Sequence, residues 1–157
     1  MRVRDLPRML LAAALFAIPL SSVSAQDDGD LKILDDIKLL AQKMALPELS
    51  GDNPIILREE WWSGSIEPGK AKLVQVQLFR RNVYRFWLAV PNEAAGLNMN
   101  LYNGDGEIVS AETIAYDTTN VVSTVVEAES TGIYYIRISL KTTVDQPEDW
   151  ALIYGYR

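Results

Sequence analysis

The tryptophans of this chain are the side chains with the clearest capacity for ligand chemistry, and they lie at positions 61, 62, 87 and 150. Exposed aromatic rings stack on sugar rings and on peptide side chains, and nearby polar groups then orient the ligand. Arg85 precedes Trp87 by two residues, so the two side chains share one face of an extended strand. This spacing predicts binding chemistry rather than catalysis.

The composition removes most familiar kinds of catalysis, because the 157 residues include no cysteine and no histidine. Nucleophilic triads that need these residues, thiolate or imidazole zinc sites, disulfides and cysteine-linked haem are excluded. Acidic residues are scattered, and Asp105 and Glu107 in one turn supply too few oxygens for calcium. We therefore expect no enzyme activity, no metal and no cofactor.

The charge balance argues against a nucleic-acid partner. There are 15 basic and 21 acidic residues, which give a formal net charge of −6. Phosphate backbones and anionic membranes attract clustered lysines and arginines. Here, Arg80-Arg81 with nearby Arg85 comes closest to such a cluster.

Residues 1–25 have the layout of a secretory signal peptide. Three arginines precede an apolar run from Met9 to Leu20, and small residues then end in Val23-Ser24-Ala25. A retained membrane anchor is the alternative, but a helix needs roughly 20 apolar residues to cross a bilayer. We expect cleavage after Ala25, a periplasmic or secreted protein, and no stable membrane insertion afterwards.

The next segment, residues 26–60, is expected to be an amphipathic helix and a linker. A helix is predicted over 27–48, because apolar residues recur there every three or four positions: Leu31, Leu34, Ile37, Leu40, Ala41 and Met44. Pro47 stops the pattern. Residues 55–60 fit either a short strand or irregular chain.

From residue 61 to 157 the pattern changes to short alternating apolar runs separated by glycine, proline, asparagine and aspartate. This texture predicts a mainly β domain, an antiparallel two-layer sandwich of about seven to eight strands. We expect strands over residues 72–79, 83–90, 97–102, 107–110, 121–127, 133–140 and 150–156.

Three segments of this β region resemble a known family. They are Tyr84-x-Phe86-x-Leu88, then Leu97-x-Met99-x-Leu101 running into Tyr102-Asn103-Gly104-Asp105-Gly106, and then Thr131-Gly132-Ile133-Tyr134-Tyr135-Ile136-Arg137-Ile138. In this order they are similar to the bacterial pre-peptidase C-terminal domain, a secreted jelly-roll-like sandwich usually appended to exported enzymes. The resemblance covers about residues 63–157. The helical segment ahead of it departs from the usual context and puts a peptidase-linked role in doubt.

Trp87 and its neighbours allow two interpretations. If Phe86 and Leu88 face the core, Trp87 and Arg85 face outward, and a sugar platform is formed if Tyr135 and Arg137 lie nearby. Alternatively, the apolar stripe of the N-terminal helix covers Trp87, and we favour this cover. A covered Trp87 removes the platform.

We therefore expect an exported, non-catalytic binding module. The leading hypothesis is protein–protein interaction in the cell envelope, through the acidic helix or the Trp61-Trp62 region, with Trp62 as a candidate anchor. The alternative is polysaccharide binding by the face centred on Trp87, Arg85, Tyr135 and Arg137. Fold alone does not choose between these ligand classes.

Overall fold

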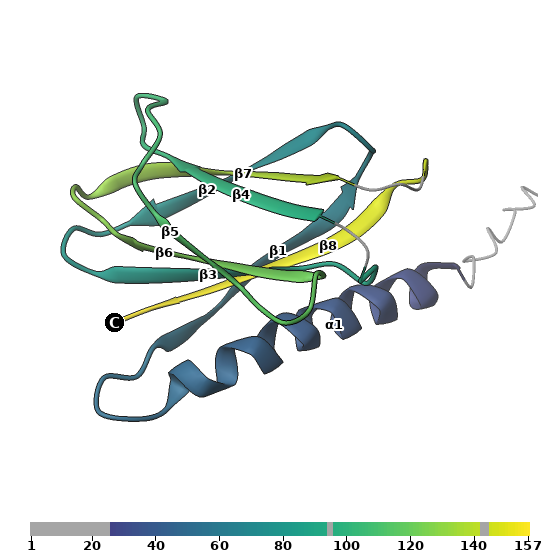
Figure 1. The fold of residues 1–157 in the computed structure, drawn as a ribbon, viewed down its shortest axis with the longest axis horizontal. Coiled ribbons are helices and arrows are strands. Elements are labelled where there is room, and N and C mark those ends of the chain that lie inside the picture. The colour runs from purple at the N-terminus through teal and green to yellow at the C-terminus, as the bar shows by residue number, and fades with distance from the viewer. Residues whose placement is uncertain (1–25, 94–95, 142–144) are drawn as a thin grey trace, which may run out of the picture.

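The computed structural model describes residues 26–93, 96–141 and 145–157, so the predicted signal peptide lies outside the described residues (Figure 1). Helix α1 (Gln26–Ala45) and a short 3₁₀ helix η1 (Leu46–Leu49) precede eight strands. These are β1 (Ile56–Ile66), β2 (Ala71–Leu78), β3 (Val83–Ala89), β4 (Gly96–Tyr102), β5 (Glu112–Ala115), β6 (Val121–Glu127), β7 (Gly132–Lys141) and β8 (Glu148–Tyr156).

The strands form two antiparallel sheets, ordered β1-β8-β3-β6-β5 and β2-β7-β4. The chain crosses from one sheet to the other between β1 and β2, between β2 and β3, and between β3 and β4. This alternation produces a jelly-roll-like order. The predicted fold class, a mainly β antiparallel sandwich preceded by an amphipathic helix, is confirmed.

One predicted strand is wrong. Residues 107–110 form an isolated bridge between Ile108 and Tyr102. The neighbouring strand is β5, which pairs with β6 on the other sheet. The chain therefore starts to extend the β2-β7-β4 sheet after the 103–106 turn and then crosses over, which ends the pairing after one bridge.

The space between the sheets holds the main core. Inward residues alternate along β2, β4 and β7, as the period of two requires. Fully buried side chains from both sheets meet there, including Leu78, Phe86, Leu88, Ile136, Ile138 and Leu152. This core fixes which side chains of each strand are left to face outward.

A second core lies on the outer face of the larger sheet, where α1 packs (Figure 1). Ile37, Ala41 and Ala45 are buried against Trp87, Ala89, Val121, Ala151 and Ile153. The favoured interpretation, in which the helix covers Trp87, is confirmed. Within the described part of the chain, no helix is both long and apolar enough to span a membrane.

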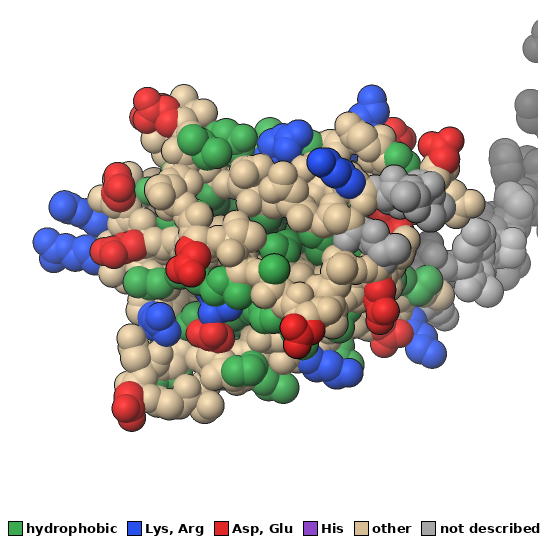
Figure 2. Space-filling view, in the orientation of Figure 1, with side chains coloured by type: hydrophobic (Ala, Val, Ile, Leu, Met, Phe, Trp, Pro, Cys, Tyr) green, Lys and Arg blue, Asp and Glu red, His purple; other side chains and the backbone are tan. Residues whose placement is uncertain are grey.

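The face drawn in Figure 2 carries charges of both signs. Acidic and basic side chains are interspersed over most of the sandwich and the helix there, and two basic side chains project together at the left edge. That face therefore presents no single-sign field for steering a charged polymer.

Gly155 is required by the close approach of β8 to the start of β1. A Cβ at this position would lie 2.5 Å from Ile55 Cγ2 and 2.7 Å from the Ile56 carbonyl oxygen. We predict that Gly155→Ala lowers the free energy of unfolding by about 1–3 kcal/mol, because the backbone must shift. Gly132→Ala, with nothing within 4 Å of its added Cβ, is the matched control. Urea denaturation measures both, and equal midpoints would refute the proposed packing constraint.

Candidate functional site

The structure places Trp87 where no ligand reaches it. The side chain is 0% exposed beneath α1, and its indole N–H donates a hydrogen bond to the Tyr116 hydroxyl at 3.1 Å. The Arg85 guanidinium lies 5.5 Å from the centroid of the Trp87 ring. The predicted platform centred on Trp87 is therefore wrong, because the apolar stripe of α1 needs the same surface.

Arg85 is also buried, and its bonds are structural. It forms an ion pair with Glu48 of η1 and donates to the Tyr116 hydroxyl at 3.2 Å. It donates twice to Ser123 Oγ, from Nη2 at 3.1 Å and from Nε at 3.3 Å. This network ties the end of the helical segment to β3 and β6, so Arg85 anchors the segment rather than a ligand.

Tyr135 and Arg137 lie on the opposite side of the molecule. Their neighbours Tyr134, Ile136 and Ile138 are buried in the core, so both side chains face out from the β2-β7-β4 sheet, half-buried. Tyr135 pairs with Gln75 across β2, and Arg137 Nη1 donates to Ser139 Oγ at 3.2 Å. The four predicted platform residues thus form two pairs, separated by the whole sandwich.

Trp62 is the predicted residue that lies beside a pocket. It is half-buried on β1, and its ring lies 5.2 Å from that of Tyr154. Tyr154 also stacks on Phe86 at 5.6 Å with an interplanar angle of 8°. Trp62 and Phe86 therefore pack against the Tyr154 ring, and Tyr154 itself lines the pocket.

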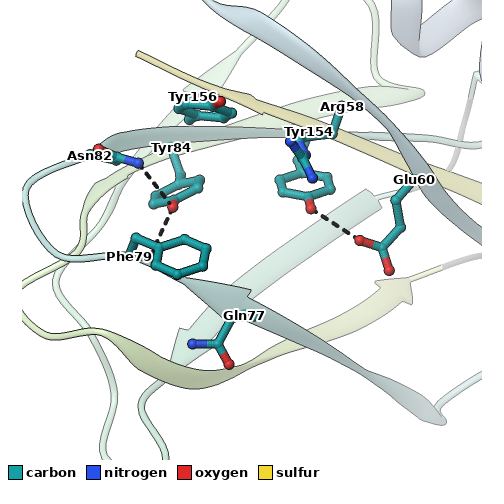
Figure 3. Close-up of a pocket in the computed structure, with 8 residues that line it drawn as sticks. All are labelled: Arg58, Glu60, Gln77, Phe79, Asn82, Tyr84, Tyr154 and Tyr156. Carbon is teal, nitrogen blue, oxygen red and sulfur yellow. Dashed lines mark hydrogen bonds between the residues drawn. The ribbon is translucent and has the colours of Figure 1, made fainter.

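A β-bulge in β1 lies beside this pocket. Leu57 pairs with Gly155 and Trp61 with Ile153, so β1 has two more residues than β8 between these pairs. A bulge bends its strand and redirects side chains, and such bulges are enriched near functional sites. Here Arg58 and Glu60 from the bulged stretch line the edge between the two sheets (Figure 3).

The inter-sheet pocket has a volume of about 300 Å³. It combines four aromatic rings with four planar polar side chains. Its lining consists of Arg58, Glu60, Gln77, Phe79, Asn82, Tyr84, Tyr154 and Tyr156 (Figure 3). The volume lies at the lower end of the range for small-molecule sites, which is roughly 300–1,000 Å³. Such a lining can stack a ring and hydrogen-bond its substituents.

Hydrogen bonds order the polar groups of the pocket. The Tyr154 hydroxyl donates to Glu60 Oε2 at 3.1 Å. The Tyr84 hydroxyl accepts from the Phe79 backbone N–H at 2.9 Å and from Asn82 Nδ2 at 3.3 Å. Burial raises the pKa of the Tyr154 phenol. Like any tyrosine, it is protonated at neutral pH and can donate.

Arg58 adds a positive charge at the mouth of the pocket. Its guanidinium carbon lies 5.9 Å from the centroid of the Tyr156 ring, and interaction with the Tyr154 phenol raises the pKa of Arg58. Tyr156 in turn packs 5.9 Å from Tyr84. The pocket therefore carries one cation and one anion, Glu60, over rings that are held in place.

The 103–106 turn is held by its own side chains. Asn103 Oδ1 accepts from the backbone N–H groups of Asp105 and Glu107 at 3.0 and 2.9 Å, and Asn103 Nδ2 donates to Glu107 Oε2 at 3.0 Å. Among the residues that the structure describes, no group of three or more acidic side chains gathers as a metal site would require.

No protein-family model matches this chain, and no curated protein matches it. The resemblance to the pre-peptidase C-terminal domain therefore stays a prediction. The interpretation of the site rests on its own geometry.

Apart from neighbouring Trp62, the sequence did not lead to this pocket. Its residues come from β1, β2, β3, β8 and the β2–β3 turn. The available signal was the polar run Arg58-Glu59-Glu60, which interrupts the apolar alternation before Trp61. An interruption of this kind within a strand is typical of a β-bulge, but it is also typical of a loop.

We predict that Glu48→Ala lowers the free energy of unfolding by about 2 kcal/mol, because it leaves the buried Arg85 guanidinium without its carboxylate. Asp52→Ala, at an exposed position in the following loop, is the control and should change stability by less than about 0.5 kcal/mol. Urea denaturation followed by tryptophan fluorescence measures the difference. Equal stability of the two variants would show that the ion pair does not secure η1.

Proposed function

We propose that this protein is an exported, non-catalytic binding module that holds a saccharide in the inter-sheet pocket. Export rests on the signal-peptide pattern of residues 1–25 and implies a periplasmic or secreted location. The resemblance to a secreted sandwich domain agrees with this setting. The binding proposal rests on the pocket.

The observation that carries the proposal is the composition of the pocket lining. A sugar ring has an apolar C–H face and a rim of hydroxyls, each of which donates and accepts hydrogen bonds. The exposed ring of Phe79 and the half-buried ring of Tyr156 offer stacking surfaces, and the polar side chains among them offer both donors and acceptors. A purely apolar guest would leave these polar groups without partners, which disfavours it.

The single carboxylate of the lining supports a binding role rather than hydrolysis. Most glycosidases flank the scissile bond with two carboxyl groups, one acting as acid and the other as base or nucleophile. Among the residues that line the pocket, Glu60 is the one acid, and it accepts a hydrogen bond from Tyr154. This arrangement orients a ligand without supplying an acid–base pair.

A protein partner in the cell envelope is the second candidate, favoured by a groove on the other side of β1. Lys38 of α1 lies 4.4 Å from the centroid of the half-exposed Trp61 ring. The groove has a volume of about 320 Å³ and is also lined by Gln42, Leu57, Arg58, Glu59 and Ile153. Tryptophan and arginine are enriched at the energetic centres of protein interfaces. Part of the α1 stripe is buried, at Ile37 and Ala41, whereas the acidic face of α1 and Trp61 stay accessible as the predicted protein-binding region.

Calorimetric titration with soluble oligosaccharides tests the proposal. We expect saturable binding to at least one of them, and Tyr156→Ala should weaken it at least about tenfold by removing a stacking ring. Tyr135→Ala on the opposite sheet face is the matched control and should bind as the wild type does.

Two results would contradict the proposal. Loss of binding in Tyr135→Ala with retention in Tyr156→Ala would place the sugar on the outer sheet face. Absence of heat with every saccharide would favour a protein partner. In that case a photo-reactive residue at position 59 should cross-link the partner, and Trp61→Ala should abolish the cross-link.

A further inference from the structure

The Tyr84 phenol is the most deeply buried polar group of the pocket, with 2% of the residue exposed. Its oxygen already accepts two hydrogen bonds, from the Phe79 backbone and from Asn82. A phenol also carries one proton to donate. Among the described residues no hydrogen bond from that proton is found, and Figure 3 shows the hydroxyl beside its two donors, Phe79 and Asn82, at one side of the pocket.

Buried donors in folded proteins almost always have an acceptor. At this position a water molecule or a guest in the pocket can supply the acceptor, and the lone pairs of the phenol are already engaged. The Tyr84 hydroxyl can therefore act only as a donor to a ligand. A guest gains most if it presents a strong acceptor, such as a carbonyl oxygen, at this point.

Glu60 can accept a hydrogen bond from a ligand. Its Oε2 accepts one bond from Tyr154, and a carboxylate has several lone-pair positions, so it can accept more. An N–H or an O–H group of a guest can supply this bond, and a hydrogen bond to the carboxylate is charge-assisted in either case. The ligand that fits these two residues therefore has a hydrogen-bond acceptor near Tyr84 and a hydrogen-bond donor near Glu60.

Apolar surface lies beside these polar groups. Phe79 is 55% exposed, and its ring forms part of the lining together with the ring of Tyr154. A small apolar group of the ligand that packs against these rings is removed from contact with water, which is favourable. The positive charge of Arg58 and the negative charge of Glu60 make the site formally neutral, which favours a neutral guest over a carboxylated one.

A secondary acetamide has all three features: a carbonyl acceptor, an N–H donor and a methyl group. We infer that the pocket recognises the acetamido group of an N-acetylated amino sugar, with Tyr84 donating to its carbonyl oxygen and Glu60 accepting from its N–H. This inference rests on the proposed saccharide binding and names the substituent that the pocket selects. Tyr84 and Glu60 are then the residues that determine specificity.

Two glycosides that differ at one carbon test the inference on the wild-type protein. Methyl β-N-acetylglucosaminide and methyl β-glucoside have the same ring and differ in the substituent at C2. We expect the acetamido sugar to bind about tenfold or more tightly, as the loss of a well-made hydrogen bond implies. Calorimetry or NMR titration measures the ratio, and the comparison needs no variant that must fold.

Variants then assign the preference to the pocket. Tyr84→Phe should bring the two affinities to within about threefold of each other, because it removes the donor and keeps the ring. Tyr134→Phe is the matched control. Tyr134 is also a buried tyrosine, 3% exposed, whose hydroxyl donates to the Ser130 carbonyl oxygen at 3.0 Å away from the pocket, so its loss should leave the ratio unchanged.

The outcomes separate this inference from the function on which it rests. Equal binding of both glycosides would overturn the acetamide assignment and leave saccharide binding in place. A preference that survives in Tyr84→Phe would overturn the role of Tyr84. Failure of every saccharide to bind would contradict the proposed function itself.

Discussion

The packing of α1 on the outer face of the larger sheet is the constraint on which the rest of the structure depends. Both surfaces are apolar, and each would be exposed without the other. Ala41 and Ala45 let the helix approach closely over Trp87, and the Arg85–Glu48 ion pair secures its C-terminal end. A buried ion pair adds little net stability but is costly to break, so it specifies where the segment lies. This packing covers the part of the sheet face around Trp87 and the buried part of the helix stripe, Ile37, Ala41 and Ala45.

The candidate binding site lies at the edge where the two sheets separate. A jelly roll leaves edge strands at the sides of its two sheets, and proteins protect such edges with bulges and charges. The 58–60 stretch of β1 has both. The same distortion lines the pocket with a cation and an anion beside rings fixed by Phe86 and Trp62. Edge protection and ligand recognition can therefore share one local feature.

The sequence predicts most of the fold because periodicity is a local property. The period of two locates β2, β3, β4, β6, β7 and β8 to within about two residues, and the 3.6-residue period locates α1. It failed at residues 107–110, did not predict β5 or the 61–66 part of β1, and left 55–60 open. A crossover and a bulge are decided by pairing with distant strands. The site was harder to foresee. The alternation of the strand predicts that the Trp87 side chain faces away from the main core. Only the tertiary packing shows that α1 covers that face.

We propose that ligand binds between the sheets beside the β1 bulge. Backbone amide chemical shifts recorded during titration with methyl β-N-acetylglucosaminide locate the binding site. We expect perturbations at residues 58–60, 77–84 and 154–156, with Tyr135, Arg137 and the residues around Trp87 unchanged. Perturbations centred on Tyr135 and Arg137, with the 58–60 stretch silent, would contradict it.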